Sequence, residues 1–355
     1  MCGTCATADR LAFLHAARNA ANRLLLGEAH VRVAKALDLT TARGFDRAVA
    51  VLAAQLREEA RVADVDALRA AVRVLDADWH ATTPTQRKHL VAAAMAAAGR
   101  ATARVPAQLR VPFGETAERV MRSTREAARR DQKLSIAVDF GALDRRVLRH
   151  VVESQGTFVR DEYGRRIEAF GAEARRVVAR GLEQGLGREA ITDILRESAH
   201  AALVTRAPFY WEIVASSFIA HGRSFAQMSS YADAGIRQYR IEAVLDEQTT
   251  PTCHFLHGKV FSVADALRRF ERVEALEDPN DIKQAIPWVR ERANSRTGES
   301  RLVAGNGEGR IAVAEFHASE PTRFRPLVSD AELADLGIGF PPYHGLCRST
   351  TIAVV

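Results

Sequence analysis

Cysteine, aromatic residues and long apolar runs are all scarce in this chain. It has 355 residues, of which 4 are cysteines and 6% are aromatic. No apolar run approaches the roughly 20 residues that span a bilayer, so we expect no membrane-spanning helix. The first residues lack a basic segment followed by a continuous apolar one, which argues against a secretory signal. We therefore expect folding in a reducing cytoplasm, where structural disulfides are rare.

The remaining composition is that of a soluble protein rich in helix. Hydrophobic residues make up 47% of the chain and charged residues 26%, a balance typical of globular proteins. Alanine and arginine, both strong helix formers, are abundant. The length predicts two or three domains. The formal net charge of +6 is compatible with binding to nucleic acid, although an arginine-rich composition can also reflect a GC-rich genome.

Helical periodicity dominates the first two thirds of the chain. Apolar residues at spacings of three and four predict one helix face at Phe45, Val49, Leu52 and Leu56. Thr83, Pro84 and Gln86 predict a helix start, with a threonine cap and proline at the first helical position. Pro106 and Pro112 predict a turn or linker that follows this helix.

Further helices are predicted over 143–203 and 209–234. Gly185 and Gly187 indicate that one helix ends there and the next begins at Arg188. In the last helix, Trp211, Phe218 and Phe225 repeat every seven residues, which favours packing in a core.

A basic stripe is predicted on the helix over 118–133. Its members are Arg122, Arg125, Arg129 and Lys133, at positions i, i+3, i+7 and i+11. Such a stripe can follow the phosphate backbone of double-stranded DNA by non-specific contacts. The alternative is a solvated face, helped by the neighbouring acidic residues Glu118 and Glu126.

The last third of the chain has a different sequence pattern. Alternation with β-branched and aromatic residues predicts strands over 239–245, 310–316 and 350–355. The segment 294–309 is rich in Asn, Gly, Ser and charge, and predicts a mobile excursion outside the core. We thus expect a mainly α fold with a small C-terminal α+β domain and a short, largely antiparallel sheet. The predicted regions are a helical 1–112, a helical 113–235 and an α+β 236–355 with an insertion at about 265–338.

Two short motifs in this last region hold half of the cysteines. Cys253 and His257 are four positions apart, and His344 and Cys347 are three apart. Together they supply four nitrogen and sulfur ligands, the number of a closed tetrahedral zinc site. One alternative is that the cysteines are small buried residues while the histidines bond backbone carbonyls. A redox pair or a disulfide is another.

Other motif residues indicate backbone architecture. Asp246 and Thr249 can form a side-chain-to-backbone turn, and Gly258 suits unusual dihedral angles. Pro341 and Pro342 favour an extended approach to the second motif. An ion pair between Arg348 and Asp246 would join the two motifs, and we state it as a hypothesis.

No complete catalytic constellation is present in the sequence. Cys253 with His344 is the one plausible nucleophile and base, while His257 and His344 could act as acid and base on a phosphodiester. Neither a phosphate-binding Gly-x4-Gly-Lys-Ser/Thr loop nor a His-Glu-x2-His motif occurs. We therefore expect a protein that is not an enzyme. Cys2 and Cys5 form an isolated Cys-x2-Cys pair, which alone is weak support for a metal or redox site.

The paired motif resembles that of the Mu F-like minor head proteins of tailed bacteriophages, also called head morphogenesis proteins. Their signature reads Asp-x-Arg-Thr-x3-Cys-x2-Leu-x-Gly-Lys-x-Phe, followed by Pro-Pro-x-His-Pro-x-Cys-Arg-Cys/Ser. Matching positions are Asp246, Thr249, Cys253, Leu256, Gly258, Lys259 and Phe261, then Pro341, Pro342, His344, Cys347, Arg348 and Ser349. Gln248 and Gly345 stand where the family usually has arginine and proline. The segment between the motifs is also longer than is common in the family.

The resemblance implies a minor head protein of a phage or prophage. Such a protein associates with the portal and other head proteins, and acts in head morphogenesis and in DNA packaging or ejection. It would occupy the bacterial host cytoplasm during assembly and the inside of the head in the virion. The alternatives are an enzyme or toxin-type domain that modifies nucleic acid or protein through Cys253, His257 and His344, and a non-specific DNA-binding module.

Overall fold

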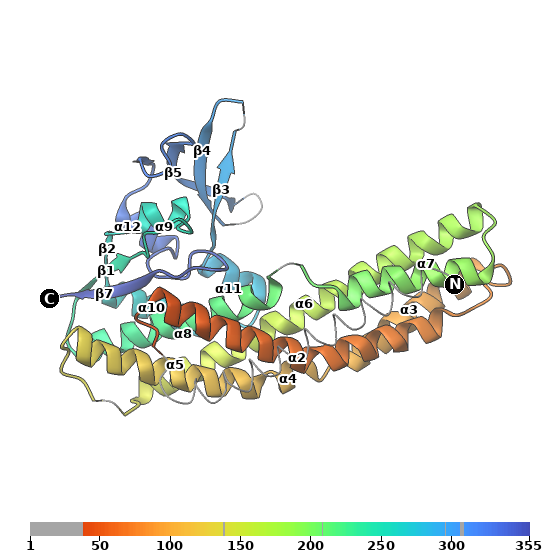
Figure 1. Cartoon of the computed structure of the whole chain (residues 1–355), viewed down its shortest axis with the longest axis horizontal. Coiled ribbons are helices and arrows are strands. Elements are labelled where there is room, and N and C mark those ends of the chain that lie inside the picture. The colour runs from red at the N-terminus through yellow and green to blue at the C-terminus, as the bar shows by residue number, and fades with distance from the viewer. Residues whose placement is uncertain (1–37, 138, 208, 295, 306–308) are drawn as a thin grey trace, which may run out of the picture.

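The computed structural model describes residues 38–137, 139–207, 209–294, 296–305 and 309–355. Long helices form an extended arm, and the strands gather at one end of it (Figure 1). The fold is mainly α with a small C-terminal α+β region, as the sequence predicts. Cys2 and Cys5 lie outside the described residues. Among the described helices, none is long and apolar enough to cross a membrane.

Helices precede the first strand. They are α2 (Ala42–Leu75), α3 (Pro84–Thr102), α4 (Val105–Gln108), α5 (Arg110–Asp131), α6 (Ala142–Glu183), α7 (Arg188–Ala199), the π-helix η1 (His200–Val204) and α8 (Tyr210–Asp233). Thr83 caps α3 through the predicted reciprocal hydrogen bonds with Gln86. The predicted helix start at Arg188 is confirmed.

The predicted break near Pro106 and Pro112 is present as two short turns, at residues 103–104 and 109, but neither proline lies in a turn itself. Pro106 lies in the first turn of α4, and Pro112 is the third residue of α5. A proline in the first turn removes no helical hydrogen bond, because the N–H groups there have no acceptor within the helix. The two prolines therefore start helices rather than separate domains.

Strands and short helices alternate in the C-terminal part. They are β1 (Gln238–Glu242), α9 (Pro251–Leu256), β2 (Val260–Ser262), α10 (Val263–Glu274), α11 (Pro279–Ala285), β3 (Val289–Ala293), β4 (Glu299–Ala304), β5 (Ile311–His317), β6 (Phe324–Pro326), α12 (Asp330–Asp335) and β7 (Thr350–Val354). They form two antiparallel sheets, in the orders β2-β1-β7 and β3-β4-β5-β6.

The predicted excursion over 294–309 is wrong for much of its described part. β4 lies within it and pairs with both β3 and β5. Leu302 in β4 is fully buried in the larger core. The polar composition of this segment reflects alternation along a strand, in which one face is buried and the other is solvated.

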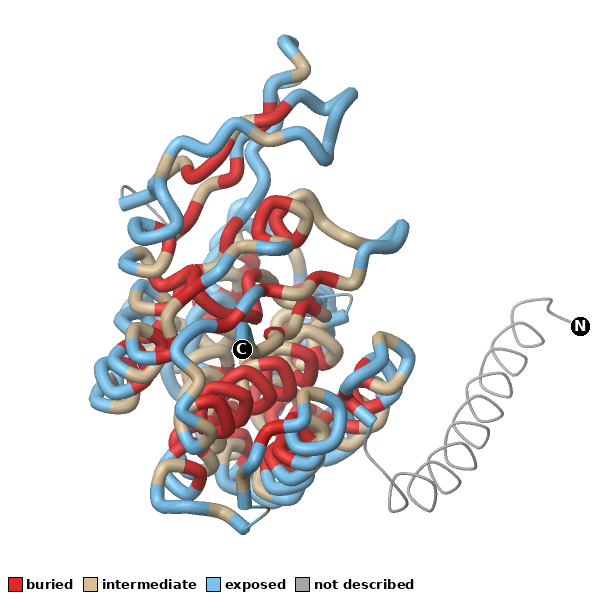
Figure 2. Tube along the Cα trace, turned by 90° about the vertical axis from the view of Figure 1, so that its left-hand side faces the viewer, coloured by how far each residue is buried: buried red, intermediate tan, exposed pale blue. Residues whose placement is uncertain are grey.

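Two apolar cores lie along the molecule. The smaller lies in the arm, where it includes Ala67, Trp79, Phe170 and Ile191. The larger extends from Leu39 to Cys347 and draws residues from all three predicted regions. The boundaries at 112/113 and 235/236 therefore do not separate independent cores. Figure 2 shows buried positions concentrated inside the bundle and where the helices meet the sheets.

Helix α8 connects the bundle to the sheets. Trp211, Phe218 and Phe225 are buried, as their seven-residue spacing predicts. Arg223, also buried, donates to the Leu39, Arg348 and Ser349 carbonyls at 3.2, 3.0 and 2.6 Å. Gln227 donates to the Thr351 carbonyl at 3.0 Å. These hydrogen bonds hold the start of β7, and the motif before it, against α8.

Candidate metal centre

The first motif is built by a turn and a short capped helix. The Asp246 carboxylate accepts from the Gln248 N–H at 3.0 Å, and the Thr249 hydroxyl accepts from the Asp246 N–H at 2.8 Å. Thr250 then caps α9, because its hydroxyl accepts from the Cys253 N–H at 3.4 Å. The predicted turn is confirmed, and it directs Cys253 inward, where the residue is 5% exposed.

The second motif is held by contacts with distant parts of the chain. The Pro341–Pro342 peptide bond is cis. The Tyr343 carbonyl accepts from the Val289 N–H of β3 at 2.9 Å. After it, the Arg348 and Ser349 carbonyls accept from Arg223 of α8. Between these anchors lie His344, which is half-buried, and Cys347, which is fully buried.

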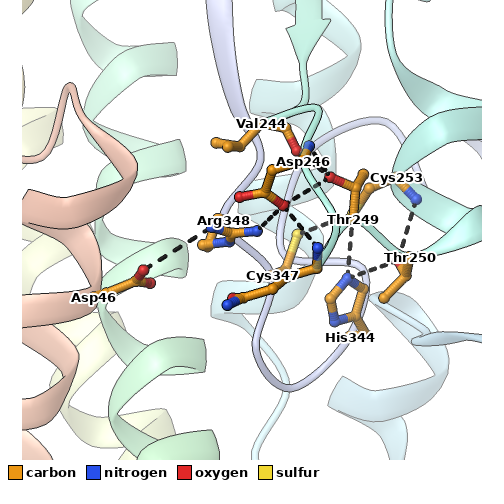
Figure 3. A network of polar contacts seen from close by, with 10 residues as sticks. Asp46, Val244, Asp246, Thr249, Thr250, Cys253, His344, Cys347 and Arg348 are labelled. Carbon is orange, nitrogen blue, oxygen red and sulfur yellow. Dashed lines mark hydrogen bonds and ion pairs between the residues drawn. The ribbon is translucent and has the colours of Figure 1, made fainter.

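Cys253, His344 and Cys347 converge in one cluster (Figure 3). The two sulfur atoms are 3.8 Å apart, and the Cys253 sulfur lies 3.1 Å from His344 Nε2. The Thr250 hydroxyl is also 3.1 Å from His344 Nε2. All three candidate ligand atoms lie within 4.8 Å of one another.

His257 does not join this cluster, so the predicted four-ligand site is wrong. Its Nδ1 accepts from the Ala243 N–H at 3.1 Å. His257 is the C-cap of α9, with φ −57° and ψ 133°. Because the chain has already left the helix there, the four-residue spacing no longer places Cys253 and His257 on one face. Gly258 follows with φ +80°, in the left-handed region predicted from its identity.

The three remaining groups fit a thiophilic metal. Two thiolates bound to one tetrahedral zinc at about 2.3 Å lie about 3.8 Å apart, which matches the observed sulfur spacing. The sulfur–nitrogen distance of 3.1 Å is that of a hydrogen bond, so the imidazole would move outward by a few tenths of an ångström to share the ion. The described residues thus offer three ligands to such an ion.

The electrostatics of the cluster favour one thiolate. The hydrogen bond with Cys347, and then burial, raise the pKa of Cys253. Burial alone would raise the pKa of Cys347, but hydrogen bonds from Cys253 and His344 outweigh it and hold this pKa well below its usual value. These opposite directions favour Cys253 as the hydrogen-bond donor and Cys347 as the acceptor in their contact. A thiolate is the form that binds metal.

Arg348 links the motifs as hypothesised. Its guanidinium lies 2.5 Å from the Asp246 carboxylate and 3.9 Å from that of Asp46 in α2 (Figure 3). This hydrogen bond lowers the pKa of Asp246. Lys259 pairs with Asp330 at 2.5 Å and lies 4.7 Å from the centre of the Phe255 ring. Both basic residues of the motifs thus have structural partners.

The basic stripe is interrupted at Arg125. This residue is 1% exposed and pairs with Asp144 at 3.0 Å and with Asp233 at 2.7 Å, so its predicted contact with DNA is wrong. At about 100° per residue, Arg129 falls within about 20° of Arg122, whereas Arg125 is about 60° away. That rotation turns Arg125 toward α6 and α8. Lys133 lies beyond the end of α5 at Asp131, so the prediction that it continues the helical stripe is wrong. Arg122, Arg129 and Lys133 are exposed.

Sequence patterns did not single out three residues that build the centre. Thr250 has a local signal, because threonine before proline is typical of a capped helix start. Arg223 and Gln227 have none, since their partners are carbonyls more than 120 positions away. Searches of protein families, curated proteins and solved structures found no match to this chain.

Proposed function

We propose that this chain is a minor head protein of a tailed phage or a prophage-derived particle, which binds the portal during head assembly. The supporting observation is the convergence of the two motifs. Cys253 and His344, 91 positions apart, are in contact, and Arg348 pairs with Asp246 across the same junction. The residues that carry the Mu F-like resemblance thus form one structural unit.

The shape of the molecule suits an assembly role. Helix α6 has 42 residues, a length of about 63 Å, and extends well beyond the sheets in Figure 1. An arm of this length presents a large surface to the portal and to other head proteins. Arg122, Arg129 and Lys133 add an exposed basic face for non-specific contacts with double-stranded DNA. The sites of action would be the bacterial cytoplasm and then the inside of the head.

The neighbouring genes and a co-expression experiment test this function. We expect portal and terminase genes beside this one, and we expect the tagged chain to retain that portal protein through size-exclusion chromatography. A variant with Arg47→Glu and Glu59→Lys, at two exposed positions of α2, checks that retention depends on a specific surface, once circular dichroism has shown that it folds. Failure of the wild-type chain to associate with a folded, co-expressed portal would refute the proposal.

Zinc at Cys253, His344 and Cys347 is the second part of the proposal. The ion would join the start and the end of the motif unit through two thiolates and one imidazole. We expect about one zinc per chain after purification without chelators, and its loss in Cys347→Ser and His344→Ala. His257→Ala is the matched control, because this histidine lies beside the centre without belonging to it. Wild-type protein that stays free of zinc after equilibration with the metal would refute this part.

An enzyme remains the competing proposal, because Cys253 and His344 are in contact as a nucleophile and base would be. Two features favour the structural role instead. His257 is outside the cluster, and Cys253 is 5% exposed. Nuclease or transferase activity that disappears in His344→Ala but survives in His257→Ala would favour the enzyme.

A further inference from the structure

A cavity of about 470 Å³ lies between α6, the first half of α8, α11 and the start of β3. It is separate from the metal centre, since none of the three candidate ligands lines it. Its walls are largely apolar, with Phe158 on α6, Ile213 on α8 and Trp288 directly before β3. The volume falls within the roughly 300–1,000 Å³ that is usual for small-molecule sites.

The inner end of the cavity is polar but uncharged. Gln155 there is 9% exposed, and His221 borders both this cavity and a smaller one of about 20 Å³ behind it. Burial lowers the pKa of His221 to about 4, so its ring is neutral at physiological pH. One ring nitrogen bonds the Ser217 backbone, while Nε2 is buried with no protein partner among the described residues. In a neutral ring that donates through Nδ1, Nε2 is an acceptor.

The mouth of the cavity carries one surplus positive charge. Arg165 pairs with Asp161 and Glu162 at 3.1 and 2.9 Å, and Lys283 lies 3.4 Å from Asp161. Arg290 is exposed and forms no ion pair within the part of the chain that the structure describes. Three cations thus face two carboxylates, and the unmatched cation is at the entrance.

We propose that this cavity binds a small aromatic monocarboxylate that carries a hydroxyl or N–H donor at its far end. The ring lies between Phe158, Ile213 and Trp288. The donor points inward to His221 Nε2, and the carboxylate stays at the mouth with Arg290. A single unmatched cation selects a monoanion, and the uncharged inner end excludes a second charge, because burying an unpaired ion is costly.

Three related compounds test this with the full-length protein. The probe is 3-(4-hydroxyphenyl)propionate, and the comparisons are its amide and 3-phenylpropionate. We expect saturable 1:1 binding of the probe by calorimetry. The amide should bind about ten-fold to a hundred-fold more weakly, because it loses a charge-assisted hydrogen bond. The compound without the hydroxyl should bind about five-fold to ten-fold more weakly. The fluorescence of Trp288 should respond, since Trp79 and Trp211 are buried elsewhere.

Variants locate the binding site. Arg290→Ala should reduce the affinity for the probe to that of the wild-type protein for the amide. Arg292 lies on the same strand but outside the cavity, so Arg292→Ala should leave the affinity unchanged. Ile213→Trp should abolish binding by filling the cavity. If that variant does not fold, the three compounds and the two arginine variants still test whether the probe binds in this cavity. No binding at millimolar concentration, equal binding of acid and amide, or equal effects of the two arginine variants would overturn the proposal.

Discussion

Gly345 of the second motif packs against the wall of this cavity. A Cβ atom added there would lie 2.8 Å from Cγ2 and 3.2 Å from Cγ1 of Ile213, and 3.3 Å from Trp288. The backbone of Gly345 lies outside the left-handed region, so alanine is sterically excluded by its neighbours and not by its own dihedral angles. Gly345→Ala therefore isolates a packing effect between the motif and α8.

The magnitude follows from two opposing contributions. Overpacking of this kind costs about 1–3 kcal/mol. Replacing glycine by alanine where the backbone permits it stabilises by about 0.4–1 kcal/mol, through the unfolded chain. We expect a net loss of about 1–2 kcal/mol in the free energy of unfolding.

Two changes at Ile213 make the test specific. Ile213→Ala removes both atoms that approach Gly345 most closely, so in that background Gly345→Ala should become stabilising by about 0.4–1 kcal/mol. Ile213→Val keeps both atoms and should give no relief. Guanidinium denaturation followed by circular dichroism, at fixed metal content, measures all six proteins. An equal effect of Gly345→Ala in the three backgrounds would show that the reasoning is wrong.

Three further predictions concern charged groups. Arg125→Ala should cost about 3–5 kcal/mol of unfolding free energy, because Asp144 stays buried without its partner; the exposed Arg129→Ala should change it by less than about 0.5 kcal/mol. The lowered pKa of His221, about 4 in the folded chain, means that the unfolded chain binds more protons between about pH 4 and 6.5. Stability should therefore rise with pH in that window and level off above it, by about 3 kcal/mol in total, and His221→Gln should flatten this rise in denaturation midpoints. Neutralising the exposed basic face should make the slope of log K for DNA binding against log salt concentration shallower, by up to about 0.9 per lost phosphate contact. An unchanged slope in filter binding would show that this face does not contact DNA. Its residues are Arg122, Arg129 and Lys133.

Local chemistry made several features predictable from the sequence. The cap formed by Thr83 and Gln86, the turn at Asp246 and the left-handed Gly258 all depend on residues within four positions. The stripe of Trp211, Phe218 and Phe225 depends only on helical periodicity. The fold class follows from the same local patterns, because long amphipathic segments and alternating segments occupy different parts of the chain.

Features that depend on distant partners were not predictable in this way. Nothing in the sequence tells that Arg125 meets Asp233, 108 positions away, and a stripe drawn from spacing alone treats it like its exposed neighbours. The pairing of Cys253 with His257 in the first motif predicts that both bind one metal, yet α9 ends at Leu256 and His257 turns to the Ala243 N–H. In both cases the residue type indicates the kind of contact that the side chain makes, while the fold determines which partner it meets.

The insertion between the motifs has a structural part in the candidate centre. Cys253 is oriented by its own cap, within three residues of chain. His344 and Cys347 have no comparable local support, and they are held between the hydrogen bond from Val289 of β3 and those from Arg223 of α8. Removing the insertion would therefore free one side of the second motif while leaving the first motif intact. Arg290 of β3 lines the cavity while Val289 of the same strand holds Tyr343, and Trp288 just before the strand packs against Gly345. A ligand in the proposed cavity site would border Gly345, which lies between the two candidate metal ligands His344 and Cys347.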